Sequence, residues 1–236
     1  MCSECGCSPV RERDSLGSLL DANDREARHN RLHLDKAGVL AVNLMSSPGS
    51  GKTALLEATI EARKHELRMA VVVGDLETEN DARRIRRHGV PAVQITTGNA
   101  CHLDALLVHE ALHEIELEQI DLLFIENVGN LVCPAAFDLG QHRNVVLLSV
   151  TEGDDKPEKY PVMFRAADLV LITKSDLAPY VGEFDAGRAE HHVRALANPA
   201  PVHALSATRS LDLGPWFAWL DAELAALRTG TAAALA

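Results

Sequence analysis

The stretch Ser46-Ser47-Pro48-Gly49-Ser50-Gly51-Lys52-Thr53 decides the fold, because it joins an apolar run to an amphipathic one. The run Val39 to Met45 predicts a buried strand, and the residues after the stretch predict a helix. Gly49 and Gly51 have no side chains, so successive backbone N–H groups can turn inward around phosphate oxygens. Strand, glycine-rich loop and helix together predict a phosphate-binding loop, with Ser46 where the strict pattern has glycine.

The last residues of this loop predict what it does with a nucleoside triphosphate. Gly49, Ser50 and Gly51 form the backbone cradle, and the ammonium group of Lys52 can reach the β and γ phosphates. The hydroxyl of Thr53 is placed to hold Mg²⁺ at the positive end of the helix dipole. We therefore expect a bound nucleotide with Mg²⁺, and Lys52 as a catalytic residue.

The rest of the chain repeats the alternation of short apolar runs with amphipathic stretches. Unbroken Val/Leu/Ile runs are typical of a sheet that is covered on both faces. The fold class predicted is α/β: a doubly wound, mostly parallel seven-stranded P-loop NTPase sheet with a flexible, cysteine-containing N-terminal arm. The further strands are expected at Met69 to Val73, Pro91 to Ile95, Leu122 to Ile125, Val145 to Val150, Leu169 to Ile172 and Val202 to Leu205. The helices are expected at roughly Lys52 to Glu66, Asn80 to His88, His102 to Glu118, Glu183 to Ala197 and Trp216 to Leu227.

Composition limits the function further. The 236 residues, of which 47% are hydrophobic, suffice for one domain core, and no apolar run reaches the roughly 18 residues of a membrane span. A net charge of −11 repels polyphosphate backbones, and the basic run Arg83 to Arg87 is typical of a solvated helix end. We expect a cytoplasmic protein with neither nucleic-acid nor membrane partners.

Four segments are expected along the chain. Residues 1–14 lack a periodic apolar pattern and should form a flexible metal-binding arm. Residues 15–38 predict an N-terminal helical segment, residues 39–230 the P-loop domain, and residues 231–236 a disordered tail.

Two segments near the end of the predicted sheet favour guanine. In Thr173-Lys174-Ser175-Asp176, the carboxylate of Asp176 can accept hydrogen bonds from guanine N1–H and the 2-amino group, and Lys174 can lie along the purine. The backbone of Ser206 and Ala207 can contact guanine O6. Thr173 replaces the usual asparagine, which ties this loop to the phosphate loop. The alternative is that Ser175 or Asp176 only caps a helix.

Two acids that follow strands are candidates for Mg²⁺ or for its bound water. Asp75 is the first choice and Glu126 the second, because the carboxyl ends of the strands form the ligand crevice of this fold. Hydrolysis would depend on positioning and charge neutralisation by Lys52 and Mg²⁺. No arginine finger is evident, so slow turnover is expected.

The N-terminal thiols predict a metal site. Cys2, Cys5 and Cys7 lie in one short loop, in which Gly6 lets all three face one ion. The α-amine of Cys2 would be a fourth donor if Met1 is removed. A planar set favours Ni²⁺ and a tetrahedral set Zn²⁺, and a redox-active tail without a metal role is the alternative.

Further potential ligands occur within the domain. Cys101, His102 and Cys133 follow two predicted strands on the crevice side, and they can converge on a metal if those strands are neighbours. Two unrelated buried thiols are the alternative. The pairs His29/His33 and His109/His113 are expected to be surface residues, because no carboxylate or thiol completes a site with either.

The cysteine tail and the phosphate loop together resemble the hydrogenase nickel-incorporation GTPases of the HypB family, which are SIMIBI-class P-loop GTPases. The likeness covers nearly the whole chain from Cys2 to Ser206, although this chain lacks the His-rich stretch of some members. Its further blocks are Gly74-Asp75-Leu76-Glu77-Thr78-Glu79-Asn80-Asp81-Ala82, Cys101-His102-Leu103-Asp104, Glu126-Asn127-Val128-Gly129-Asn130-Leu131-Val132-Cys133-Pro134 and Glu152-Gly153-Asp154-Asp155-Lys156-Pro157.

The resemblance implies a GTP-hydrolysing nickel metallochaperone that works on the [NiFe]-hydrogenase large subunit precursor with a HypA-type zinc/nickel accessory protein. It also implies a GTP-dependent homodimer, a tight nickel site at Cys2, Cys5 and Cys7, and a weaker Ni²⁺ or Zn²⁺ site at Cys101, His102 and Cys133. Two alternatives are a urease- or cobalamin-enzyme-assembly GTPase of the same superfamily, and a metal-buffer protein that does not hydrolyse nucleotide.

Overall fold

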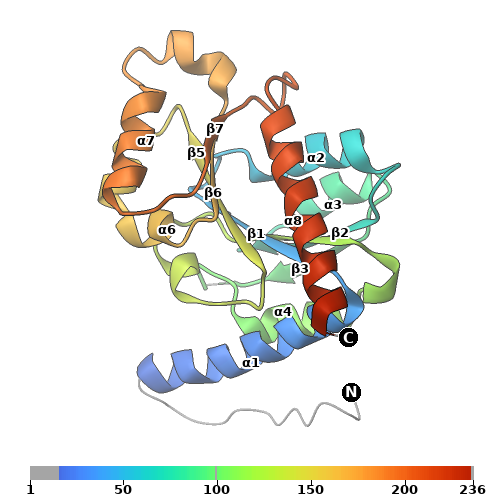
Figure 1. Cartoon of the computed structure of the whole chain (residues 1–236). Helices are drawn as coiled ribbons and strands as arrows, with labels where there is room; N and C mark the ends of the chain where they lie inside the picture. Colours follow the sequence, from blue (N-terminus) through green and yellow to red (C-terminus); the bar gives the residue numbers. More distant parts are fainter. Residues whose placement is uncertain (1–15, 99, 235–236) are drawn as a thin grey trace.

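The computed structural model describes residues 16–98 and 100–234 of the chain. In this part, seven strands form one sheet in which every neighbouring pair is parallel, in the order β3-β2-β4-β1-β5-β6-β7 (Figure 1). The strands are β1 (Leu40–Ser46), β2 (Met69–Asp75), β3 (Ala92–Thr96), β4 (Leu122–Glu126), β5 (Arg143–Ser149), β6 (Leu169–Thr173) and β7 (Val202–Ala204). The predicted fold class is confirmed, and the sheet is parallel throughout.

The helices alternate with the strands, as the sequence predicts. The α-helices are α1 (Leu16–Ala37), α2 (Lys52–Arg63), α3 (Asn80–Arg86), α4 (Ala105–Leu112), α5 (Lys156–Lys159), α6 (Pro161–Arg165), α7 (Ala186–Ala195) and α8 (Gly214–Ala234). Three 3₁₀ turns are η1 (Leu117–Gln119), η2 (Cys133–Ala136) and η3 (Ser175–Tyr180). Within the described ranges, none of the helices has both the length and the apolar character of a membrane span.

Some helix boundaries differ from those expected. Helix α4 begins at Ala105 and not at residue 102, because the Asp104 side chain caps it by accepting a hydrogen bond from Leu107 N. Helix α8 continues beyond residue 230. Two short helices, α5 and α6, were not predicted, and each carries a proline in its first turn, where the missing N–H costs no hydrogen bond.

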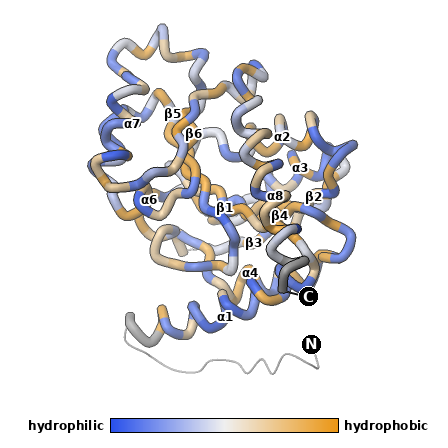
Figure 2. Tube along the Cα trace, in the orientation of Figure 1, coloured by the Kyte–Doolittle hydropathy of each residue, from blue (hydrophilic) through white to orange (hydrophobic). Residues whose placement is uncertain are grey.

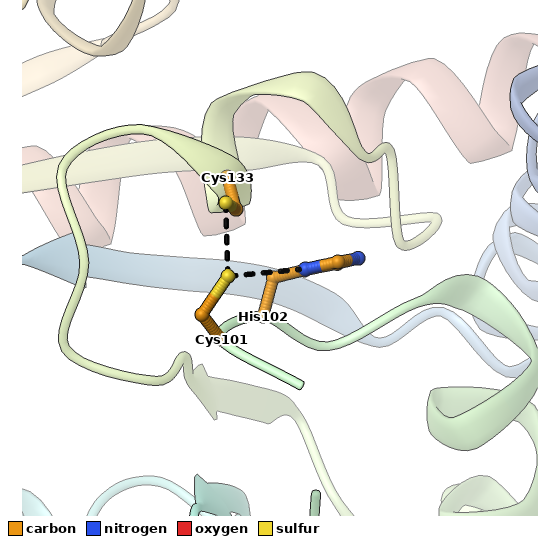
Figure 3. Close-up of side chains that lie close together, drawn as sticks. All are labelled: Cys101, His102 and Cys133. Carbon is orange, nitrogen blue, oxygen red and sulfur yellow. Dashed lines mark hydrogen bonds between the residues drawn. The ribbon is translucent and has the colours of Figure 1, made fainter. Parts of the chain in front are cut away.

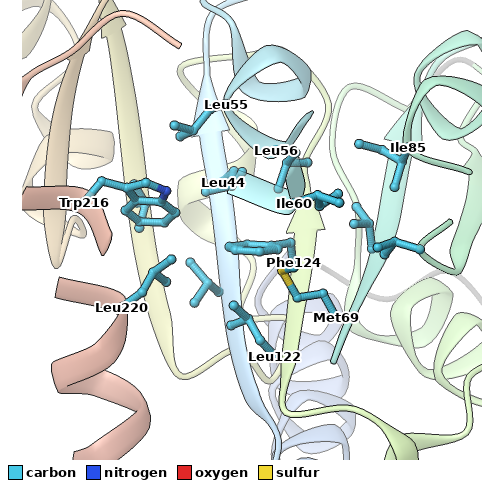
Figure 4. Close-up of a cluster of buried hydrophobic side chains, with 14 of the residues drawn as sticks. Leu44, Leu55, Leu56, Ile60, Met69, Ile85, Leu122, Phe124, Trp216 and Leu220 are labelled. Carbon is cyan, nitrogen blue, oxygen red and sulfur yellow. The ribbon is translucent and has the colours of Figure 1, made fainter. Parts of the chain in front are cut away.

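The core has two sides because strand residues alternate between the faces of the sheet. On one face, Leu44 of β1 packs with Phe124 and Trp216 beneath α2, α3 and α8 (Figure 4). On the other face, Ala41 of β1 packs under α1 and α4, and Met45 packs under α6 and α7. Figure 2 shows hydrophobic residues concentrated along the strands. Since all strands run the same way, the loops that follow β1, β2, β4 and β6 meet at one edge of the sheet.

Candidate functional site

The phosphate loop has the backbone shape that its glycines allow. Gly49 and Gly51 have positive φ angles of 74° and 99°, in the left-handed region that favours glycine. Helix α2 follows at once, with Leu55 N donating to Gly51 O. Ser46, which replaces the first glycine of the strict pattern, is buried, and its Oγ accepts a hydrogen bond of 3.0 Å from Lys52 Nζ. The substitution therefore positions the lysine.

Lys52, Thr53 and Glu126 form a buried polar group at the start of α2. Thr53 Oγ1 donates a hydrogen bond of 2.7 Å to Glu126 Oε1, whereas Glu126 Oε2 has no hydrogen-bond partner among the described residues. Burial raises the pKa of Glu126 to about 7, against the opposing effects of Lys52 and Thr53. Burial also lowers the pKa of Lys52. A buried carboxylate oxygen without a partner, beside a threonine hydroxyl, suits a hard cation such as Mg²⁺.

Asp75 lies at the end of β2, where its two oxygens bond to its own loop. Asp75 Oδ1 accepts a hydrogen bond from Leu76 N, and Oδ2 accepts one from Thr78 Oγ1. Each of these hydrogen bonds is 2.6 Å long. Its charge still raises the pKa of Lys52, although less than that of Glu126 does. Of the two acids expected near Mg²⁺, Glu126 is therefore the one in contact with Thr53.

The segment expected to recognise guanine is tied to the phosphate loop. Thr173 Oγ1 donates a hydrogen bond of 2.6 Å to Ser50 O. Threonine therefore ties this segment to the phosphate loop, as the usual asparagine was expected to do. Lys174 follows with a positive φ of 58°. The buried atoms Asp176 Oδ1 and Ser206 Oγ have no hydrogen-bond partner in the described part of the chain. Such buried polar atoms are available to a ligand.

The two segments of this expected base site are also held together. Ser175 N donates to Leu205 O, which brings the loop after β6 against the end of β7. Ala207 is half-buried beside Ser206 and accepts at its carbonyl oxygen from Ser210 N. The structure thus brings Asp176, Ser206 and Ala207 to one loop cluster, as the sequence analysis expected.

One residue that supports the phosphate loop was not predicted as part of the site. Glu152 Oε1 accepts a hydrogen bond of 2.5 Å from Ser50 Oγ and one of 3.2 Å from Ser149 N. It thereby joins the loop after β5 to the phosphate loop. Its occurrence in a block shared with the resembled family was the available signal, because no local pattern indicates a contact across 102 residues.

The second cluster contains Cys101, His102 and Cys133 (Figure 3). The two sulfurs are 2.9 Å apart as free thiols, and Cys101 Sγ is 3.9 Å from His102 Nδ1. The His102 ring stacks on Phe137, with centroids 3.9 Å apart. One ligand atom from each of the three residues lies within 4.8 Å of the others. Two thiols and an imidazole suit Zn²⁺ or Ni²⁺.

The strands that precede these residues are not neighbours, contrary to the condition set in the sequence analysis. Strand β2 lies between β3 and β4, and the loop after β3 crosses to reach Cys133. The hydrogen bond from Asn130 Nδ2 to Cys101 O, 3.4 Å long, joins the two loops. Convergence therefore depends on the loops and not on strand pairing.

The loop after β4 touches both clusters. At Gly129, an added Cβ would lie 2.8 Å from Pro48 Cα, so this glycine packs directly on the phosphate loop. Asn130 bonds to the carbonyl of Cys101, and Cys133 comes three residues later. One short segment thus connects the phosphate loop with the thiols. Cys2, Cys5 and Cys7, the thiols of the predicted N-terminal metal-binding arm, lie outside the described residues.

Comparison with known proteins agrees with a nucleotide-binding domain. Residues 40–204 match the family model described as CobW/HypB/UreG, nucleotide-binding domain. The chain is 50% identical over 210 residues to the hydrogenase maturation factor HypB of Azotobacter vinelandii, covering 89% of this chain and 68% of that one. It is 47% identical over 205 residues to HypB of Escherichia coli strain K12, covering 87% and 70%.

A solved structure is also similar. The crystal structure of HypB from Helicobacter pylori in complex with nickel superposes with a TM-score of 0.81 at 41% identity, covering 89% of this chain and 97% of that one. Fold, sequence and family model therefore agree over the region that carries both clusters.

Proposed function

This chain belongs to the HypB family within the CobW/HypB/UreG nucleotide-binding proteins, and we propose that it is a GTP-hydrolysing nickel metallochaperone for [NiFe]-hydrogenase maturation. The observation that carries the proposal is the loop after β4. Its Gly129 packs on Pro48 of the phosphate loop, its Asn130 bonds to Cys101, and its Cys133 lies beside that thiol. A shift of this loop on loss of the γ-phosphate would change the thiol site.

The proposed nucleotide is GTP. Gly49, Ser50 and Gly51 cradle its phosphates by their backbone, and Lys52 neutralises the charge that develops on phosphoryl transfer. Mg²⁺, when bound by Thr53 with Glu126 or Asp75, supplies further charge neutralisation at the phosphates. At the base, Asp176 accepts from the guanine N–H groups while Lys174 lies along the ring and Ser206 and Ala207 face O6. Support comes from the buried oxygen of Asp176, which has no partner within the described residues.

The proposed cargo is nickel. Cys2, Cys5 and Cys7 would form the tight site in the N-terminal arm, and Cys101, His102 and Cys133 would form a weaker Ni²⁺ or Zn²⁺ site whose affinity depends on the nucleotide. The nickel in the Helicobacter pylori relative supports nickel as the metal. The donor sets support a borderline divalent ion at both places.

The proposed partners follow from the family. A HypA-type accessory protein would exchange metal with this chain, and the large subunit precursor of a [NiFe]-hydrogenase would receive nickel. GTP would favour a homodimer, and GDP its dissociation. We place these events in the cytoplasm, where thiols stay reduced and able to bind metal.

Nickel titration with and without GTP, followed together with phosphate release and molecular mass, tests this proposal. We expect Mg²⁺-dependent phosphate release, a doubling of mass with GTP and a nucleotide-dependent nickel affinity. Cys2→Ala combined with Cys5→Ala should abolish tight nickel binding and leave turnover unchanged. Absence of phosphate release above background would instead indicate a metal buffer that only retains a nucleotide loop.

A further inference from the structure

The packing of α1 against α4 gathers a third set of metal-ligating side chains, and none of them is a cysteine. It contains Glu26, His29 and His33 of α1 with His109 of α4 and His113 at the C-cap of α4, and we call this set the histidine seam. The sequence analysis expected two separate surface pairs without a carboxylate. That expectation was wrong, because the two helices pack together, His109 is only 5% exposed and Glu26 lies between the pairs.

Distances within the histidine seam are close to those of a chelate. His109 Nε2 and His113 Nε2 are 3.0 Å apart. Two nitrogens bound to one ion at 2.0–2.1 Å lie roughly 2.8–3.4 Å apart for cis or tetrahedral angles. The ring centroid of His33 is 5.7 Å from that of His109 and 6.4 Å from that of His113, so a third imidazole lies near this pair.

Hydrogen bonds set the orientation of the His109 ring. The Asn30 amide donates to Ala105 O and Leu139 O, which turns Asn30 Oδ1 toward His109 Nδ1 at 3.0 Å. Glu26 Oε1 is also 3.4 Å from Nδ1. Two acceptors at Nδ1 keep its proton there, so the lone pair is on Nε2 and points toward His113. A carboxylate or carbonyl behind a ligating imidazole is the usual second-shell arrangement of a metal site.

The charge state and the access of the histidine seam also suit a cation. Burial, followed by the neighbouring imidazoles, lowers the pKa of His33. Burial likewise lowers the pKa of His109. Neutral imidazole is the form that binds metals. His113 is exposed, which leaves the seam open to solvent on that side.

We propose that the histidine seam binds one divalent transition-metal ion of borderline softness, Ni²⁺ or Zn²⁺. The ligands are Nε2 of His109, Nε2 of His113 and the imidazole of His33. Glu26 and Asn30 orient His109 from behind, and His29 packs against the rings of His33 and His109. This site contains no thiol and lies on two helices away from the phosphate loop. It goes beyond the proposed function, which assigns metal only to the cysteine sites.

Metal titration of the full chain tests the proposal once the thiols are removed. Cys2, Cys5, Cys7, Cys101 and Cys133 are all replaced by Ser, and the protein is titrated with Ni²⁺ and separately with Zn²⁺ by calorimetry. We expect one equivalent to remain bound. His113→Asn and His33→Gln should each weaken that binding by at least about 10-fold. Both positions are at least partly exposed, so the folded state should tolerate the changes.

The matched control replaces another histidine pair, His191→Asn with His192→Asn on α7, where no metal cluster occurs among the described residues. This control should leave the remaining equivalent unchanged. The proposal is overturned if the thiol-free chain retains no metal, or if His113→Asn and His33→Gln weaken binding no more than the control does. Failure of the proposed GTPase function would appear separately, as absent phosphate release from the chain with all its cysteines.

Discussion

The thiol cluster and the histidine seam lie close together along the chain but differ in what surrounds them. Cys101 and His102 precede α4 in a loop that Asn130 joins to the segment packed on the phosphate loop. His109 lies on α4, and His113 caps the C-terminus of that helix; both face α1, a helix that contributes no residue to the nucleotide site. The first cluster is built on loops that a nucleotide can move, and the second on packed helices.

This difference predicts two kinds of metal binding in one protein. Loop-borne ligands that contact a nucleotide-sensing segment change their spacing when that segment moves. Ligands that project from two packed helices keep their spacing, because close-packed cores do not deform continuously. The thiol cluster should therefore respond to GTP, and the histidine seam should not.

Lys52→Ala should have the largest effect and should separate the two regions. The buried ammonium provides the main fixed positive charge at the phosphates, so its removal should lower phosphate release by about 100- to 1,000-fold. Metal affinity at the histidine seam should stay the same. Phosphate release and Ni²⁺ titration of one preparation measure both, with partly exposed Lys64→Ala as the control. Retained turnover would show that the loop is misassigned.

Glu126 belongs to the nucleotide site, and its carboxyl group should make the free energy of unfolding depend on pH. Its pKa is raised from 4.5 to about 7 in the fold, so its stabilising contribution is complete below 4.5 and is lost as pH rises through 7. Without nucleotide or Mg²⁺, the difference in unfolding free energy between the wild type and Glu126→Gln should change by up to about 3 kcal/mol across this window.

Denaturant unfolding at several pH values measures that difference. Glu110→Gln, an exposed acid on α4, is the control and should show no comparable trend. The same slope in the wild type and in Glu126→Gln would mean that another group titrates.

The sequence predicted most features that a short stretch of consecutive residues determines, apart from the short helices α5 and α6. Each of the seven strands was recognisable as an apolar run, and the phosphate loop as a motif between strand and helix. Local patterns did not determine how distant segments reach each other. The thiols converge although β2 separates their strands, and Thr173 bonds to Ser50 across 123 residues. The histidine seam requires α1 to pack on α4, which no local pattern states.

Gly129→Ala should weaken the connection between the phosphate loop and the thiol cluster. A Cβ here would lie 2.8 and 2.9 Å from Pro48 Cα and N, and backbone atoms cannot move aside as a flexible side chain can. We expect a loss of about 1–3 kcal/mol in unfolding free energy and a smaller effect of GTP on Zn²⁺ affinity at Cys101 and Cys133. Gly214→Ala, where a Cβ meets open space, is the control. An unchanged GTP effect would contradict the role of this contact.

Thr173→Val should have the smallest effect and should be confined to the nucleotide side. It removes the hydrogen bond to Ser50 O while keeping the shape of the side chain, at a cost of about 1–2 kcal/mol. Because the bond holds the guanine-recognition segment against the phosphate loop, GTP affinity should fall by roughly 5- to 30-fold in a direct binding measurement. Thr173→Ser keeps the hydroxyl and should bind GTP as the wild type does. A loss in Thr173→Ser with none in Thr173→Val would mean that packing of the methyl group, and not the hydrogen bond, connects the two loops. Metal binding at the histidine seam should be unaffected in either case.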